Sequence, residues 1–327
     1  MKNSILTILS LLLIFTQHPI FGKSSTTKLK GDLIIFHAGS LAVPFRDISR
    51  EFKRLHPEVR VFLESAGSRT CARKISDLNR NCDVMASADY TVINELLIPK
   101  YSSWNIKFVS NEMSIAFHKF SRRWKDMNKN TWYRILLDEN VVFGRADPNT
   151  DPCGYRSVLT IKLAEMFYGQ NGLAGKFLEK DRRFIRPKEV DLLALLESQT
   201  IDYLFIYRSV ARQHGLNFIS LPDETNLKTP QKKHIYARAE VRISGKKPGS
   251  FITKKGEPMV YGITIPNNSQ NPEVALEFVR FVLEEGMGMK IMMQNGQPSV
   301  IPSPTKTFEK IPPVLQRFAL PFRSLDG

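Results

Sequence analysis

Short apolar runs alternate with amphipathic stretches over the first hundred residues of the chain. Three of these runs have the length of buried strands: residues 33–36, 59–63 and 82–87. Each is followed by small residues and then by helical spacing, which is clearest in residues 41–55, where Phe45, Ile48 and Phe52 recur on one face. In the second helix, Ile75 and Leu78 are expected to face inward. Three strand–helix units in a row predict a parallel sheet with helices on its faces.

A second series of strand–helix units begins at residue 141. It contains a predicted helix over residues 155–167 and an apolar strand over residues 203–207. Residues 222–257 are polar and rich in turn residues, with one strand expected near 236–243. A further strand over 260–265 and an amphipathic helix pair over 272–293 close the pattern.

The two series predict an α/β protein of two lobes. Lobe 1 is expected to contain residues 31–117 and 260–327, and lobe 2 residues 118–259, including the crossover segment. Two crossing strands would form a hinge, and the cleft between the lobes is the natural place for a ligand.

The first 22 residues have a different character. Lys2 is followed by an apolar run over residues 5–15, which is too short to span a bilayer, and then by polar residues and Gly22. This pattern predicts a secretory signal peptide over residues 1–22 and therefore a periplasmic or otherwise extracytoplasmic protein.

The chain is basic, with a formal net charge of +15 over 327 residues. Its lysines and arginines are scattered, without interleaved aromatic residues or zinc-finger spacing, so we expect no nucleic-acid partner. A general attraction for anions or for anionic envelope surfaces is one explanation of the charge, and a solvated basic surface is the other. We expect a monomer.

Three cysteines, Cys71, Cys82 and Cys153, leave at least one thiol unpaired. A disulfide between Cys71 and Cys82 is possible but not indicated. None of the three has CxxC spacing, which disfavours a zinc site.

The strongest candidate site follows the first two strands. Gly39 and Ser40 follow one strand and Ser68 the next, each at the entry to a helix. Right-handed crossovers place such turns at one edge of a parallel sheet, where free N–H groups and hydroxyls attract anions. The alternative is a pair of loops that only need small residues.

A second candidate stretch runs over residues 147–157. Asp151 followed by Pro152 is typical of a helix N-cap with proline in the first turn. The functional alternative places Asp151 at the cleft, with the N–H of Cys153 free to donate to a ligand. Cys153 as a nucleophile has no identified base.

Two further residues complete the candidate set. Glu189 begins a predicted helix, where the helix dipole favours an acid, and capping of that helix is the alternative to a role in binding. Tyr207 ends an apolar strand, where core packing is the alternative role. His37 fits a structural role better than a catalytic one, because no Asp–His–Ser order accompanies it.

These stretches together resemble one family. The motifs are HAGSL (37–41), SAGSRT (65–70), SADY (87–90), DPNTDPCGYRS (147–157), EVDLLALLES with DYLFIYRSVARQHG (189–215) and VYGITIP (260–266). Over residues 31–305 the chain looks like the tungstate/molybdate-binding proteins of ABC transporters. The resemblance implies a class II periplasmic-binding-protein fold with ligand contacts at Gly39, Ser40, Ser68, Asp151, Pro152, Cys153, Glu189 and Tyr207. The segment between Asp151 and Glu189 is shorter than in some members.

The resemblance also implies a function: capture of tungstate or molybdate and delivery to a membrane ABC permease. No lysine or arginine is among the residues assigned to the ligand, and two carboxylates should repel a dianion. The pair makes sense if Asp151 and Glu189 approach the Mo(VI) or W(VI) centre itself, which accepts more than four oxygens. No catalytic residue and no cofactor are expected. The alternatives are a receptor for phosphate, sulfate or thiosulfate, or an enzyme on the same scaffold that uses Ser40 or Cys153.

Overall fold

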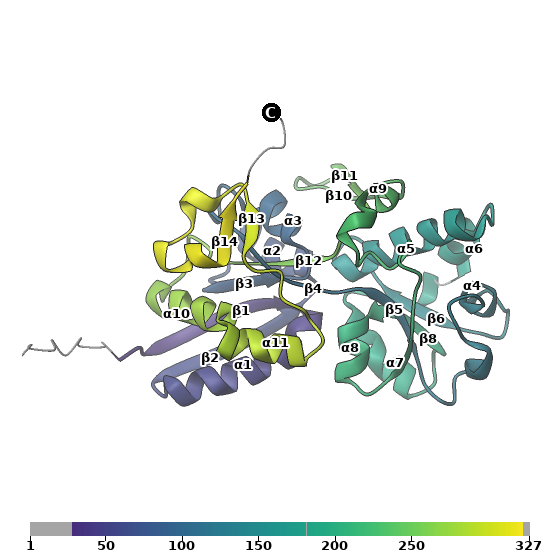
Figure 1. Cartoon of the computed structure of the whole chain (residues 1–327), viewed down its shortest axis with the longest axis horizontal. Coiled ribbons are helices and arrows are strands. Elements are labelled where there is room, and N and C mark those ends of the chain that lie inside the picture. Colours follow the sequence, from purple (N-terminus) through teal and green to yellow (C-terminus); the bar gives the residue numbers. More distant parts are fainter. Residues whose placement is uncertain (1–27, 181, 323–327) are drawn as a thin grey trace, which may run out of the picture.

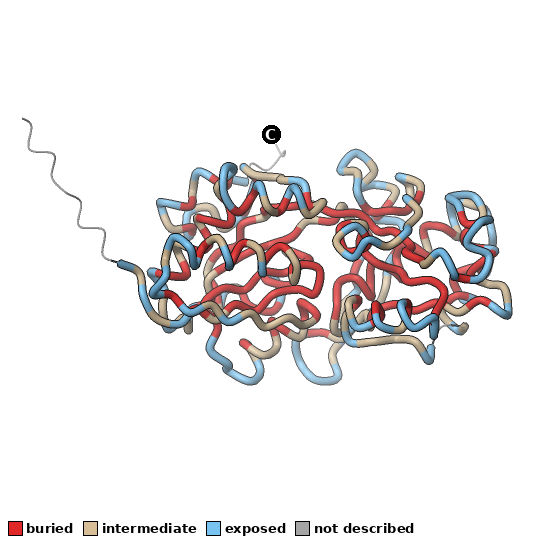
Figure 2. Tube along the Cα trace, turned by 90° about the horizontal axis from the view of Figure 1, so that it is seen from below, coloured by how far each residue is buried: buried red, intermediate tan, exposed pale blue. Residues whose placement is uncertain are grey.

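Two five-stranded sheets form the two lobes of the molecule, which lie side by side in Figure 1. The computed structural model describes residues 28–180 and 182–322, so the predicted signal peptide lies outside the described residues. Within these ranges, no helix is both long and apolar enough to cross a membrane. Figure 2 shows buried residues running through both lobes.

The first lobe is built on a mixed sheet. Its strand order is β2 (Val59–Ala66), β1 (Gly31–Ala38), β3 (Val84–Ser87), β12 (Val260–Thr264) and β4 (Ile106–Ser110). β1 is parallel to β2 and β3, whereas β12 is antiparallel to both of its neighbours. The three predicted strand–helix units are therefore present, in a sheet that a later strand completes.

Helices cover both faces of this sheet. They are α1 (Ala42–Leu55), α2 (Ser68–Ser76), α3 (Tyr90–Val92), α10 (Pro272–Leu283) and α11 (Lys290–Gln294). Successive residues of β1 alternate between two hydrophobic clusters, Ile35 packing with α1 and α10 and Phe36 with α2. Ile75 is buried as predicted, but Leu78 is 68% exposed because α2 ends at Ser76.

The second lobe has the strand order β7 (Ile185–Arg186), β6 (Phe143–Ala146), β8 (Tyr203–Tyr207), β5 (Met113–Phe117) and β9 (Asn217–Ser220). Its helices are α4 (Trp132–Leu136), α5 (Pro152–Tyr168), α6 (Leu173–Lys180), α7 (Leu193–Glu197) and α8 (Arg208–Gln213). Trp132 contacts Phe177 and Phe205 with ring centroids 5.6 and 5.9 Å apart, which makes the core of this lobe aromatic.

The chain crosses between the sheets twice. It leaves the first sheet between β4 and β5, at residues 111–112, and not near residue 117, because β5 pairs with β8 and β9. Periodicity identified both strands, but it contains no information about which sheet a strand joins.

The return crossing is more structured than the single strand expected near residues 236–243. It contains α9 (Lys233–Tyr236) and a hairpin of β10 (Glu240–Ser244) and β11 (Phe251–Lys255). In Figure 1 the hairpin lies at the top of the molecule, between α3 of one lobe and α5 of the other. Arg73 of α2 donates from Nη2 to the carbonyl of Gly245 at 2.6 Å, so the hairpin is bound to lobe 1.

Two short strands, β13 (Ser303–Thr305) and β14 (Ala319–Pro321), lie near the C-terminal end of the described chain.

The three cysteines are buried and free, so Cys71 and Cys82 are not bonded to each other.

Asp83, just before β3, joins the last part of the chain to the first sheet. Its Oδ2 accepts from the N–H of Ile34 at 2.8 Å, and its Oδ1 accepts from Ser269 Oγ and the N–H groups of Gln270 and Asn271 at 2.7–3.1 Å. The side chain is 2% exposed. One carboxylate therefore fixes the start of α10 against β1.

We expect Asp83→Ala to lower the free energy of unfolding by about 3 kcal/mol, because several buried donors lose a charged acceptor. Urea unfolding would measure this. Glu51→Ala, which removes an exposed ion pair with Arg54, should cost less than about 1 kcal/mol. Equal losses in the two variants would contradict this role of Asp83.

Candidate functional site

Two glycines mark where the lobes approach most closely. A Cβ added at Gly67 would lie 2.4 Å from the carbonyl oxygen of Thr150, and one at Gly39 would lie 2.9 Å from Oε2 of Glu189. At Gly67 the neighbour is backbone, so glycine is required there, whereas a side chain at position 39 would displace the carboxyl group of Glu189. The predicted residues of lobe 1 and lobe 2 therefore face each other directly.

The turn after β1 forms a short 3-10 helix, Gly39–Leu41, before α1 begins. Ser40 is fully buried, and its Oγ lies 2.9 Å from the hydroxyl of Tyr261. Ser68 opens α2, and its Oγ accepts a hydrogen bond from the N–H of Ala88 at 2.9 Å. Both predicted serines are thus oriented by neighbouring strands of the same sheet.

Asp151 is the N-cap of α5, with Pro152 in the first turn. Its Oδ1 accepts from the N–H of Cys153 at 2.7 Å, and its Oδ2 accepts from the N–H of Glu189 at 3.3 Å. This corrects one expectation: the N–H of Cys153 is not free, because the cap geometry turns the aspartate side chain back onto it. Asp151 caps the helix and faces lobe 1 at the same time.

Glu189 is the most unusual residue of the set. It is 1% exposed, and neither carboxyl oxygen accepts a hydrogen bond from a donor among the described residues. Burial first, and then the neighbouring Asp151, raise the pKa of Glu189 well above its usual range, and a protonated Glu189 can donate to the carboxylate of Asp151. Burial likewise raises the pKa of Asp151. A buried carboxyl group that accepts no hydrogen bond from the protein marks this position as a candidate ligand site.

Tyr207, at the end of β8, is fully buried, and its hydroxyl oxygen accepts from Nη1 of Arg156 at 3.0 Å. Arg156 also donates to the carbonyl of Ala88 at 2.7 Å. The sequence reasoning missed Arg156, although it lies within the 147–157 motif. The sequence does contain one signal for it: Arg156 is a charged residue in the first half of α5, a helix whose other residues are mostly buried.

The hydroxyls of Ser40, Ser68 and Tyr207 are each hydrogen-bonded to another group of the protein. Ser68 accepts from the N–H of Ala88, and Tyr207 accepts from Arg156, so both keep a proton for an anion. Tyr261 accepts from Nδ2 of Asn111 at 2.9 Å and can donate its own proton to Ser40. With that orientation, Ser40 also keeps a proton that it can donate.

Comparison with known proteins agrees with this two-lobed arrangement. The model of the family "bacterial extracellular solute-binding protein" matches residues 33–296. The chain belongs to this family. An uncharacterized solute-binding protein of Petrotoga mobilis is 46% identical over 291 residues, covering 89% of this chain and 90% of that one.

A second relative of this solute-binding protein is named for its ligand. The molybdate/tungstate-binding protein WtpA of Thermococcus kodakarensis is 39% identical over 338 residues, covering 94% of each chain. Among solved structures, the periplasmic molybdate-binding protein of Azotobacter vinelandii superposes with a TM-score of 0.56 at 13% identity, covering 81% of this chain and 98% of that one. The likeness at this identity shows the fold, a class II periplasmic-binding-protein fold with two α/β lobes.

The geometry of this solute-binding protein gives no support to a nucleophilic enzyme. Burial raises the pKa of Cys153 well above its usual range and lowers the pKa of His37 to about 4. His37 Nδ1 is 2.8 Å from the carbonyl oxygen of Ala38, and Ser40 is bound to Tyr261. The recorded hydrogen-bond partner of the Cys153 thiol is the carbonyl of Phe205, so neither candidate nucleophile is bonded to His37.

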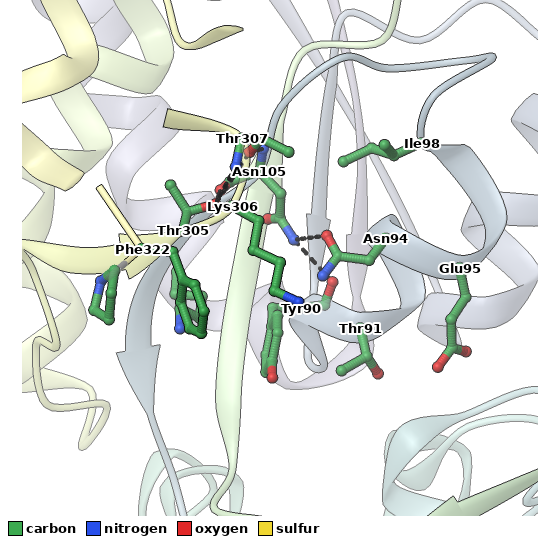
Figure 3. A pocket seen from close by; sticks show the side chains of 12 residues that line it. Tyr90, Thr91, Asn94, Glu95, Ile98, Asn105, Thr305, Lys306, Thr307 and Phe322 are labelled. Carbon is green, nitrogen blue, oxygen red and sulfur yellow. Dashed lines mark hydrogen bonds between the residues drawn. The ribbon is translucent and has the colours of Figure 1, made fainter. Parts of the chain in front are cut away.

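A separate cavity of about 470 Å³ lies beside α3. Figure 3 shows Tyr90, Thr91 and Glu95 along one side and Thr305, Lys306 and Phe322 along the other. The cavity contains none of the predicted ligand residues. Its edge is nevertheless connected to the site, because Lys254 Nζ donates to Thr91 and Glu95 and lies 3.8 Å from Oδ2 of Asp89.

We expect Glu189→Gln to stabilise the unliganded protein at pH 8 by about 1 kcal/mol, or about 2–4 °C in Tm. The pKa of Glu189 is higher in the folded than in the unfolded chain. Its contribution to stability is therefore full below the usual pKa of a glutamic acid and is lost as the pH rises through the raised value.

Thermal melts of both proteins between pH 5 and pH 8 would measure this effect. The gap between Glu189→Gln and the native chain should widen with pH, and the exposed Glu197→Gln should show no gap. A gap that is constant with pH would contradict the proposed burial of an ionisable group.

Proposed function

We propose that this protein works outside the cytoplasm, where it captures tungstate or molybdate between its lobes and delivers it to a membrane ABC permease. The observation that supports the proposal is the position of the Glu189 carboxyl group. It is buried next to Asp151 and against Gly39 of the other lobe, and it accepts no hydrogen bond from the described residues. The ligand named for the Thermococcus relative supports the same class of anion.

The carboxyl pair selects the kind of ligand. Among the described residues, no cluster of three or more His, Cys, Asp or Glu side chains is placed to hold a metal ion. A bare cation would therefore have too few protein ligands, whereas molybdate and tungstate bring four oxygens of their own. Two carboxylate oxygens then complete an expanded coordination shell around the hard Mo(VI) or W(VI) centre.

The hydroxyls account for the rest of the shell. Ser40, Ser68 and Tyr207 each retain a proton to donate, so they suit the oxygens of a fully deprotonated anion. Sulfate would accept the same hydrogen bonds, but its sulfur does not bind additional carboxylates, and Asp151 and Glu189 would repel it. Discrimination between the oxyanions thus depends on the two carboxyl groups of lobe 2.

The remaining parts of the proposal concern transport. The predicted signal peptide over residues 1–22 would export the chain, and the lobes would close on the anion by a shift of the open–closed equilibrium. We propose a monomer that acts as a receptor and not as an enzyme. The membership of the solute-binding family supports this role.

We expect tungstate and molybdate at 100 μM to raise the Tm of the purified mature chain, because both bind only the folded protein. Sulfate and phosphate at the same concentration should leave it unchanged. Differential scanning fluorimetry would measure the shifts, and calorimetry would give the affinities.

The variant Asp151→Ala with Glu189→Ala should lose the response to tungstate and its distinction from sulfate. Glu197→Ala, an exposed substitution on α7, serves as the control. A double variant that still bound tungstate and rejected sulfate would remove the carboxyl groups from the mechanism.

We expect tungstate binding to release protons over the pH range in which the carboxyl pair of the unliganded protein is still protonated. Carboxylates coordinate a metal centre in their ionised form, whereas burial holds the pKa values of Asp151 and Glu189 above their usual range before the ligand binds. Affinity should therefore rise with pH over this range. Calorimetry in two buffers of different ionisation enthalpy counts the protons.

Proton uptake would favour the other receptor hypothesis. A protonated Asp151 or Glu189 would then donate to an oxygen of a tetrahedral anion, and phosphate or sulfate would compete with tungstate in the same titration.

A further inference from the structure

We propose that Arg156 is a positioning residue for the oxyanion: it orients the Tyr207 hydroxyl toward the ligand and links that hydroxyl to Ala88 of the opposite lobe. The inference rests on the proposed function. It goes beyond the predicted contacts, which contain no cation.

The contacts of Arg156 define its role. The side chain is 3% exposed on α5, and a single nitrogen, Nη1, donates both to the Tyr207 hydroxyl at 3.0 Å and to the Ala88 carbonyl at 2.7 Å. Nη1 carries two hydrogens, one for each acceptor. The guanidinium group therefore bridges a lobe 2 strand end and the loop that follows β3 in lobe 1.

This arrangement determines the direction of the Tyr207 hydroxyl. A guanidinium group has no acceptor atom, so Tyr207 must accept from Arg156 and cannot donate to it. Within residues 28–180 and 182–322, the Tyr207 hydroxyl has no other hydrogen-bond partner. Its proton is thus available for an oxygen of the bound anion.

Ala88 connects this pair to the other side of the site. Its N–H donates to Ser68 Oγ, while its carbonyl accepts from Arg156. One peptide segment of lobe 1 therefore supports a hydroxyl from each lobe. Arg156 therefore contacts both Tyr207 in its own lobe and the opposite wall of the site.

The guanidinium group of Arg156 is held in place by an acidic neighbour. Asp89 Oδ2 lies 3.8 Å from Nη2 of Arg156 and accepts a hydrogen bond from the Tyr155 hydroxyl. The neighbouring Lys254 pairs more closely with Glu95, at 2.6 Å, than with Asp89, at 3.8 Å. Asp89 therefore mainly serves Arg156 and fixes its guanidinium group against Tyr207.

A double-mutant cycle on tungstate affinity tests the inference. Calorimetry would compare the native chain, Arg156→Gln, Tyr207→Phe and the double variant. Each single variant should bind about 10–100-fold more weakly, as expected for a lost hydrogen bond to a charged ligand. Because Arg156 acts through Tyr207, the double variant should bind at least about tenfold more tightly than the product of the single losses predicts.

A buried arginine elsewhere provides the matched control. Arg69 is fully buried, donates to the carbonyl of Asn149 at 3.1 Å and has no contact with Tyr207. Arg69→Gln combined with Tyr207→Phe should be additive. If Arg156→Gln does not fold, as judged by circular dichroism, Arg156→Lys replaces it, and the same tenfold coupling is expected.

The outcomes separate the two proposals. If the losses of tungstate affinity in Arg156→Gln and Tyr207→Phe simply multiply in the double variant, the positioning role is wrong. Tungstate binding by the native chain would still support the proposed function in that case. A native chain that bound neither tungstate nor molybdate would overturn the proposed function and this inference with it.

Discussion

The burial of Asp151 and Glu189 against a glycine of the opposite lobe is the constraint on which the rest of this site depends. Burying two adjacent carboxyl groups lowers the stability of the fold unless hydrogen bonds or opposite charges compensate the burial. The carboxyl oxygens of Glu189 accept no hydrogen bond within the described chain. Such a pair lowers the stability of the folded chain. This cost agrees with the proposal that the pair is part of a ligand site.

The surrounding structure supports this pair through a few backbone groups. Ala88 orients Ser68 by its N–H and Arg156 by its carbonyl, while the N-cap role of Asp151 fixes its carboxylate at the start of α5. Each support is a hydrogen bond from a regular element, so the geometry of the site follows from the geometry of the two sheets. Rigid elements hold polar groups in place more accurately than loops do.

The same features separate binding from catalysis. An enzyme needs a reactive group and a base whose pKa values are near the working pH. Here burial raises the pKa of Cys153 and lowers that of His37, so both groups are neutral at pH 7. The proposed receptor role uses only the hydrogen-bond donors and the two carboxyl groups of the site.

Local sequence patterns determined much of this protein. The strands that begin at residues 31, 59 and 84 and the helix after Asp151 could be predicted, because apolar periodicity and turn chemistry are local properties. The ligand contacts at Gly39, Ser40, Ser68, Asp151 and Glu189 stay a prediction that the family motifs imply. The tertiary structure alone decided that β5 joins the second sheet, that residues 240–255 form a hairpin and that the N–H of Cys153 is occupied. It also brought Arg156 to Tyr207, 51 positions further along the chain. Pairing between distant segments depends on packing, which no local pattern contains.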